Sequence, residues 1–214
     1  MAKPKGKAAV EAILPRLEEK FPNAKYELDW ETPLQLLVAT ILAAQCTDER
    51  VNKVTKTLFP KYKDARAYAE AKTEELEEAI RPTGTYKNKA KSIQGACKVL
   101  VERFHGEVPK TMDELKQLPG VQRKTGNVIL NTAFNIASGI IVDTHVMRVS
   151  PRIGLTTEEK PEAIERDLMA IVPKERWTFW GPAMVLHGRY VCTAKNPKCG
   201  ECNLNDLCEK NGVA

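Results

Sequence analysis

One stretch of the chain decides its expected fold, residues 118–125, which read Leu118-Pro119-Gly120-Val121-Gln122-Arg123-Lys124-Thr125. Pro119 stops a preceding helical segment, and Gly120 permits a tight turn before a second helix opens at Arg123. The first amide groups of a helix have no partner inside it, so this helix start leaves backbone N–H groups able to hold a phosphate. The pattern predicts a phosphate-binding hairpin, and a plain helix–helix turn remains the alternative.

Lys124 falls in the first turn of that second helix. The positive end of a helix disfavours a further cation and so helps to lower the pKa of an ammonium group. A lowered pKa raises the fraction of neutral amine, which is the nucleophilic form. Taken by itself, Lys124 also fits the role of a phosphate-binding lysine.

A carboxylate follows in Val142-Asp143-Thr144-His145-Val146, after a short apolar run. Asp143 stands directly before a helical segment, where aspartate is a common N-cap. His145 by itself is expected to be partly buried and hydrogen-bonded. Neither residue indicates a function on its own.

Four of the six cysteines, Cys192, Cys199, Cys202 and Cys208, have the spacing C-x6-C-x2-C-x5-C. Four thiolates in one short loop define a closed metal site, and both a tetrahedral zinc ion and a [4Fe-4S] cluster accept them. Lys195 and Lys198 lie between the first two cysteines. These lysines fit either a loop that contacts DNA phosphates or an ordinary solvated surface.

The 214 residues are 43% hydrophobic and carry 33 Lys and Arg against 28 Asp and Glu, a net charge of +5. This balance leans toward a polyanionic partner. The sequence shows no apolar run of signal-peptide or membrane-spanning length. We therefore expect an intracellular protein, cytoplasmic and nucleoid-associated if bacterial, in which a disulfide framework is not expected and Cys46 and Cys97 serve packing.

Most segments show helical start and stop signals, so we expect an all-α fold. Thr32 and Pro33 precede the apolar run 34–44, and Thr111 with Glu114 has capping-box spacing. The run 140–142 is too short and unpartnered for a strand. The other helices are expected over residues 49–58, 74–80, 87–104, 123–137, 144–153, 158–171 and 179–191.

In combination these motifs resemble the endonuclease III family of DNA glycosylases, within the helix-hairpin-helix superfamily. The resemblance runs through residues 37–48, 84–90, the hairpin, 142–148 and 187–190 to the four cysteines, and so covers nearly the whole chain. Three motifs occur in the order typical of this family: the hairpin with Lys124, the VDTHV segment at 142–146 and the four-cysteine spacing. Together they form a highly specific set.

The resemblance implies a two-domain all-α fold with a C-terminal cluster loop. One domain would be a helical barrel with the hairpin over 26–136, and the other would join 1–25 to 137–214. The four cysteines would hold a [4Fe-4S] cluster that is chiefly structural and DNA-docking. The active site would lie between the domains of a chain expected to be monomeric.

The resemblance also implies a bifunctional DNA glycosylase and AP lyase that excises oxidised pyrimidines from damaged double-stranded DNA. The neutral Lys124 amine would attack C1′, expel the base and form a Schiff base that permits β-elimination. Asp143 would stabilise the positive charge that develops on the sugar.

Further residues would contact DNA, with Gln45 filling the gap left by the extruded nucleotide and Thr85 forming a second wedge. The full set is Gln45, Thr85, Gly120, Val121, Gln122, Arg123, Thr125, His145, Arg189, Lys195 and Lys198. Three positions depart from the family pattern: Thr85 replaces a larger apolar residue, Gln122 a glycine and Gly126 an alanine. A left-handed backbone at Gln122 would cost about 1–2 kcal/mol.

Three rival functions share part of these features. They are a glycosylase without lyase activity, such as a mismatch-specific relative, a non-catalytic DNA-binding module, and an iron-sulfur redox carrier. Lys124 argues against the first, because such relatives usually lack lysine there. Asp143 is left without a role by the other two.

Overall fold

The computed structural model describes residues 3–213, and every regular element in this range is a helix. The chain divides into two compact units. One comprises Glu27–Asn135 and contains the hairpin, and we call it the hairpin unit. The other joins Met1–Tyr26 to Ile136–Ala214, and we call it the cysteine unit. The expected all-α fold is confirmed.

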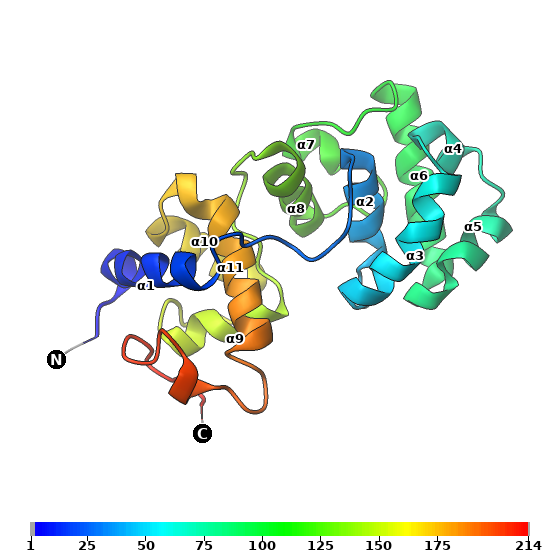
Figure 1. The fold of residues 1–214 in the computed structure, drawn as a ribbon. Helices are drawn as coiled ribbons and strands as arrows, with labels where there is room; N and C mark the ends of the chain where they lie inside the picture. The colour runs from blue at the N-terminus through cyan, green and yellow to red at the C-terminus, as the bar shows by residue number, and fades with distance from the viewer. Residues whose placement is uncertain (1–2, 214) are drawn as a thin grey trace. The chain divides into compact units, whose positions relative to one another are not determined.

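The hairpin unit contains seven α-helices and one short 3-10 helix among its described residues. They are α2 (Pro33–Leu42), α3 (Asp48–Lys61), α4 (Ala65–Ala69), α5 (Thr73–Ile80), η1 (Arg81–Thr83), α6 (Tyr86–Arg103), α7 (Met112–Leu115) and α8 (Arg123–Phe134). The long α6 packs against α4 and α5, and α2 packs against α8 (Figure 1). Thr32 caps α2 by accepting a hydrogen bond from the Gln35 amide, which confirms the predicted start of this helix.

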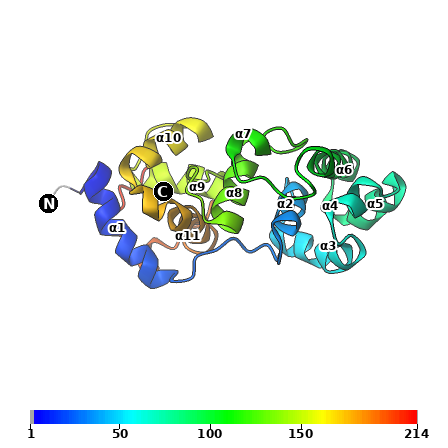
Figure 2. The same cartoon turned by 90° about the horizontal axis from the view of Figure 1, so that it is seen from above.

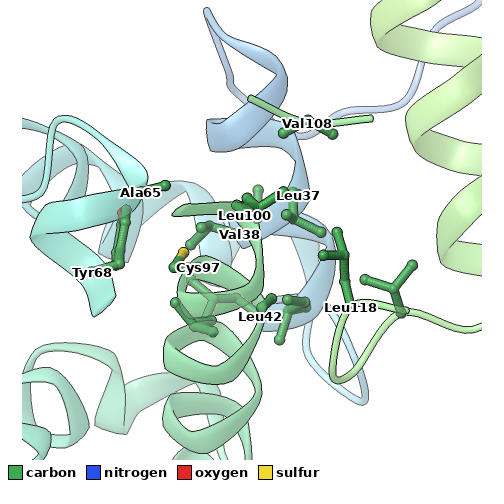
Figure 3. Close-up of a cluster of buried hydrophobic side chains, with 14 of the residues drawn as sticks. Leu37, Val38, Leu42, Ala65, Tyr68, Cys97, Leu100, Val108 and Leu118 are labelled. Atoms are coloured by element: carbon green, nitrogen blue, oxygen red, sulfur yellow. The ribbon is translucent and has the colours of Figure 1, made fainter. Parts of the chain in front are cut away.

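One apolar core joins the segments that carry the hairpin. Leu42 of α2, Cys97 and Leu100 of α6, and Leu118 at the entry to the hairpin are all buried in it (Figure 3). Full burial of a leucine side chain contributes about 1.5–3 kcal/mol. The turn after Leu118 is therefore anchored in the same apolar core as α2 and α6.

The cysteine unit contains four α-helices and two 3-10 helices in the described part of the chain. They are α1 (Gly6–Lys20), α9 (Thr144–Ile153), α10 (Pro161–Ile171), η2 (Lys174–Arg176), α11 (Trp177–Tyr190) and η3 (Cys199–Glu201). The main helix pair is α9 against α11, which lie side by side in both views (Figure 2). Gly188 permits this approach, because a Cβ there would lie 2.7 Å from Cβ of His145.

The expected helices are all present, and their ends differ where local signals were misread. The helix expected over 123–137 ends at Phe134, because Asn135 adopts a left-handed conformation with φ 52°. The helix expected over 158–171 starts at Pro161, where proline occupies the first helical position. The short α4 was not expected. Among residues 3–213, no helix has both the length and the apolar character needed to cross a membrane.

Candidate active site and metal centre

The hairpin turn requires glycine at position 120 for two independent reasons. Gly120 has φ +81°, a conformation that costs a residue with a Cβ about 1–2 kcal/mol. A Cβ at this position would also lie 2.7 Å from Cβ of Ser92 on α6. The turn is closed by the Val121 amide, which donates to the Leu118 carbonyl at 3.0 Å. The turn thus presses directly on α6.

The start of α8 has no side-chain cap. Gln122 is the N-cap residue, and its side chain makes no capping hydrogen bond. The Gly126 amide donates to the Gln122 carbonyl at 2.9 Å as the first bond of the helix. The amides of Lys124 and Thr125 precede this bond, so they are placed as a phosphate site would need them.

Gln122 stands where the family pattern has a glycine, yet its backbone is not strained. Its backbone is extended, with φ −100° and ψ 176°, and any residue adopts this conformation. The cost of a left-handed backbone therefore does not arise here. Gly126 is explained by packing, since a Cβ there would lie 2.7 Å from Sδ of Met112 on α7. The thioether of Met112 occupies the space that an alanine methyl would fill.

Lys124 is the second residue of α8, and its side chain is exposed. Its neighbours Gln122 and Arg123 are exposed too, whereas Thr125 is half-buried. An exposed amine at a helix start can reach a bound polyanion without reorganising the core. The role of Lys124 as nucleophile stays a prediction, with which its exposed position agrees.

Asp143 caps α9, as its position in the sequence predicts. Its Oδ1 accepts hydrogen bonds from the His145 amide at 2.9 Å and the Val146 amide at 3.0 Å. These two bonds fix the orientation of the carboxylate and do not involve Oδ2. Capping and chemistry therefore do not exclude each other at this residue.

Tyr26 is a neighbour of Asp143 that the sequence did not reveal. Burial, followed by the negative charge of Asp143, raises the pKa of the Tyr26 hydroxyl well above its usual value. The hydroxyl has no hydrogen-bond partner among the described residues. It lies at Gly181, where a Cβ would be 3.0 Å from the tyrosine oxygen. The carboxylate thus has a neutral hydroxyl near it at every physiological pH.

His145 is half-buried and hydrogen-bonded, as expected. Its Nδ1 lies 3.2 Å from Nη2 of Arg148. A guanidinium only donates, so Nδ1 accepts and the ring proton of neutral His145 sits on Nε2. Arg148 also donates to the Gly188 carbonyl at 2.7 Å and to the Cys192 carbonyl at 3.2 Å. It therefore ties α9 to the loop that carries the cysteines.

The four cysteines of the C-terminal loop surround one cavity. All four are half-buried and free of disulfides, and they line one small pocket of about 20 Å³ that is partly open to solvent. Within residues 3–213, no three His, Cys, Asp or Glu side chains converge closely enough to hold a single ion. The thiols line one pocket without converging on a single point, and four thiolates in one short loop can serve either zinc or a cluster.

Arginines from two helices hold this loop in place, and the sequence did not reveal them. Arg152 of α9 donates to the Thr193 carbonyl at 2.8 Å, and its Nη1 lies 3.5 Å from Sγ of Cys192. Arg16 of α1 donates to the Asn203 carbonyl at 2.8 Å, and Asn203 returns a bond to the Arg16 carbonyl at 2.7 Å. The shape of the loop is thus defined by protein contacts as well as by its thiols.

Burial determines the protonation of the groups around the cavity. It raises the pKa of the Cys202 and Cys208 thiols and so favours their neutral form, whereas coordination to a metal would deprotonate them. His187 lies beside them, with Nε2 3.7 Å from Sγ of Cys202. Burial, with a smaller contribution from Lys20, lowers the pKa of His187 to about 4. The imidazole is therefore neutral and adds no positive charge.

The predicted site residues fall in both units. The hairpin unit carries Gln45, Thr85, Gly120, Val121, Gln122, Arg123, Lys124 and Thr125, and the cysteine unit carries Asp143, His145, Arg189, Lys195, Lys198 and the four cysteines. Lys195 and Lys198 are exposed, and Arg189 is half-buried. Cys97 is buried in the core, where burial raises its pKa to about 12, and its expected packing role is confirmed.

Comparison with known proteins identifies the class to which this fold and hairpin belong. The model for the HhH-GPD superfamily base excision DNA repair protein matches residues 38–174. The model for the iron-sulfur binding domain of endonuclease III matches residues 192–208. Both matched ranges include the motifs described above, namely the hairpin with Asp143 and the four cysteines.

The chain is 56% identical to the endonuclease III of Synechocystis sp. over 196 residues, which span 92% of this chain and 90% of that protein. It is also similar to a solved non-covalent endonuclease III–DNA complex, with a TM-score of 0.90, 45% identity and coverage of 95% of both chains. A trapped endonuclease III–DNA covalent intermediate matches with the same TM-score and identity, over 95% of this chain and 96% of that one.

The chain therefore belongs to the endonuclease III family of base excision repair proteins. The expected class of enzyme, a DNA glycosylase and AP lyase, is confirmed with the family. The expected [4Fe-4S] cluster is confirmed with its binding domain, whose ends coincide with Cys192 and Cys208.

Proposed function

We propose that this chain excises oxidised pyrimidines from double-stranded DNA and then cuts the strand, with Lys124 as nucleophile and Asp143 as its charged partner. The observation that carries the proposal is the exposed lysine at the second position of the hairpin helix in a chain of this family. The solved covalent endonuclease III–DNA intermediate, 45% identical in sequence, supports a reaction that passes through a bond between protein and DNA.

The reaction begins when the damaged nucleotide leaves the base stack. Extrusion costs a few kcal/mol and is easiest for bases that stack poorly, as oxidised pyrimidines do. Gln45 and Thr85, which are both exposed on loops of the hairpin unit, fill the space that the nucleotide leaves. The lesion thus contributes to its own selection.

Lys124 then acts on the exposed sugar. A bond forms between the neutral amine and C1′ while the glycosidic bond breaks. The electron pair of the glycosidic bond leaves with the base, and the base takes up the proton that the attacking nitrogen loses. Opening of the sugar ring yields a Schiff base. Loss of a C2′ proton then sends electrons through this Schiff base and expels the 3′ phosphate, which is the β-elimination that cuts the strand.

Asp143 stabilises the positive charge that develops on the sugar and assists proton movement. Its two capping bonds hold the carboxylate in one orientation before DNA arrives. A preorganised charge needs no reorientation during the reaction, which is why a fixed carboxylate is more effective than a mobile one.

DNA is bound through phosphates in two ways. The amides of Lys124 and Thr125 at the start of α8 receive one phosphate, while Lys195, Lys198 and Arg189 offer cations, and His145 offers its Nε2–H. Cys192, Cys199, Cys202 and Cys208 would hold the [4Fe-4S] cluster, which would stiffen the loop that presents Lys195 and Lys198. We further propose that the protein acts as a monomer in the cytoplasm, at the nucleoid if the source is bacterial.

Borohydride trapping tests this function. DNA with thymine glycol or an abasic site is incubated with the protein, and reduction of the Schiff base is expected to leave a covalent adduct. Lys124→Gln is expected to abolish the adduct, and Lys98→Gln, an exposed lysine of α6, serves as the matched control. Equal trapping by Lys124→Gln would remove Lys124 from its role, and base removal without any adduct would indicate a glycosylase without lyase activity.

A further inference from the structure

Gln45 and Thr85 are among the exposed residues of the hairpin unit that have a left-handed backbone, as His105 and Asn135 also do. Gln45 follows α2 with φ 54°, and Thr85 precedes α6 with φ 42° and ψ 32°. A left-handed backbone is unusual for residues other than Gly, Asn and Asp, and for a β-branched threonine it is an outlier. Such strain persists only where the surrounding structure enforces it. We therefore expect buried contacts at the base of each loop to enforce its conformation.

The side chain of Lys89 makes hydrogen bonds at the base of both loops. It sits on the first turn of α6 and is only 4% exposed, although it carries an ammonium group. Its Nζ donates to the Leu42 carbonyl at 2.8 Å and to the Thr83 carbonyl at 2.7 Å. Leu42 is the last residue of α2, three positions before Gln45, and Thr83 lies two positions before Thr85. One ammonium group thus joins the bases of two loops that lie far apart in the sequence.

The cost of burying this lysine indicates that the link does more than fill space. Burial lowers the pKa of Lys89, because a charged group is removed from water. Its two hydrogen-bond acceptors are backbone carbonyls and not carboxylates. The Leu42 carbonyl belongs to the negative end of α2, which favours a cation. A helix end and a neighbouring turn together define where the ammonium group sits.

The Leu42 and Thr83 carbonyls belong to different elements of the hairpin unit, α2 and η1. Leu42 contributes its side chain to the core of the hairpin unit (Figure 3), and Thr83 is buried at the end of η1. The Thr83 hydroxyl is already engaged with the Ile80 carbonyl at 2.8 Å. α2 and η1 both pack against α6, and the two directional bonds from one Nζ add a fixed spacing between the carbonyls at the two loop bases.

We propose that Lys89 is a positioning residue that makes Gln45 and Thr85 act as one wedge during nucleotide extrusion. The inference rests on the proposed function, in which these two residues enter the space left by the damaged nucleotide. Lys89 touches neither DNA nor the reacting sugar. Its role is to keep the two loop tips at a fixed separation, so that neither can enter the stack without the other.

Lys89→Met tests the proposal, because methionine has a similar length and no hydrogen-bond donor. Single-turnover base removal from a duplex with thymine glycol is expected to slow by about 100-fold, the loss typical of a misplacement near 1 Å. Cleavage at an abasic site in single-stranded DNA requires no wedge and is expected to change less than about twofold. Lys89→Arg, which keeps donors for both carbonyls, is expected to recover part of the duplex rate.

The matched control is Lys91→Met, which removes an exposed lysine from the same helix. A fluorescent 2-aminopurine placed beside the lesion reports unstacking directly, and Lys89→Met is expected to reduce its signal while Lys91→Met does not. Equal loss on duplex and single-stranded DNA would make Lys89 a general stabilising residue and overturn the proposal. A wild-type duplex rate in Lys89→Met would overturn it as well.

A cycle of loop variants tests the same idea with Lys89 intact, so it does not depend on the folding of Lys89→Met. If the two loops act as one wedge, Gln45→Ala combined with Thr85→Ala slows duplex base removal no more than the worse single variant. Independent loops would instead give multiplied effects, which would overturn the proposal. A wild-type protein that processes neither substrate would refute the proposed function itself, an outcome that the variants cannot produce.

Discussion

The helix starts of α8 and α9 carry the two charged residues of the proposed reaction, and they are built in opposite ways. In the hairpin unit, the N-cap residue Gln122 does not cap α8 with its side chain, and Lys124 lies in the first turn, at the positive end of the helix. In the cysteine unit, α9 is capped twice by Asp143. The first arrangement leaves amides and an amine available for a ligand, while the second uses the protein's own amides to orient a carboxylate.

The difference shows how one local device serves two chemical purposes. Amides without a cap attract an anion from outside, which at α8 would be a DNA phosphate. Amides that are satisfied by a carboxylate hold that carboxylate still, at the expense of external binding. The comparison therefore separates residues whose loss changes DNA binding from residues whose loss changes the reaction.

The sharpest test of this comparison is Asp143→Asn. Asparagine caps a helix about as well as aspartate, so α9 is expected to stay folded while the negative charge is lost. Base removal in single turnover is expected to slow by about 100-fold or more, with DNA binding nearly unchanged. Asp143→Ala, which also removes the cap, is expected to lose about 1 kcal/mol of stability in addition. An unchanged rate in Asp143→Asn would leave Asp143 as a cap alone.

The second test concerns the turn that places α8. Gly120→Ala is expected to destabilise the protein by about 1–2 kcal/mol through its φ and by a further 1–3 kcal/mol through the clash with Ser92. Gly106→Ala is the matched control, because Gly106 has φ +84° and a Cβ there would meet nothing within 4 Å. Urea denaturation measures both. Equal losses would mean that α6 yields to the added methyl group.

The third test addresses how the cysteine unit contacts phosphates. Lys195→Ala combined with Lys198→Ala is expected to weaken DNA binding and to reduce the slope of log K against log salt by about 2, one for each lost contact. Both lysines are exposed, so the fold should not change. Titrations at several salt concentrations measure the slope. A slope equal to that of the wild type would identify the loop as an ordinary solvated surface.

The smallest effect is expected for Gln122→Gly. Because Gln122 has an extended backbone, glycine relieves no strain, and stability is expected to change by less than about 1 kcal/mol. Adduct formation at Lys124 should persist, since no side chain caps α8 in either protein. Thermal unfolding and borohydride trapping measure the two properties. Stabilisation by 1–2 kcal/mol would show that Gln122 is strained after all.

Local signals in the sequence were sufficient where a helix is bounded by strong caps. The segment from Thr144 to Ile153 was expected with the ends it has, because Asp143 begins it and Gly154 ends it. The same signals failed for α4, which has five residues and an Asp64 cap but too few apolar positions to show a period. Asn135 was missed as a helix end because its left-handed conformation is not evident from residue type alone.

The sequence predicted some parts of the site better than others. Spacing alone located the four cysteines but left zinc and a cluster open, and the family comparison decided between them. The sequence carries one signal for Lys89, because this residue stands on the apolar stripe of α6 with Ile93, Ala96 and Leu100. A charged residue on such a stripe indicates a buried hydrogen-bonding role. Arg16, Arg148 and Arg152 left no such signal.

The sequence by itself determined the helical fold, the hairpin with Lys124, the cap at Asp143 and the four-thiol loop. These features depend on residues close together in the chain, where caps, breakers and spacing act. Only the tertiary structure decided that Gln122 is unstrained, that Met112 occupies the space beside Gly126, and that Lys89 joins two loops. Those facts depend on contacts between distant segments, which no local pattern encodes.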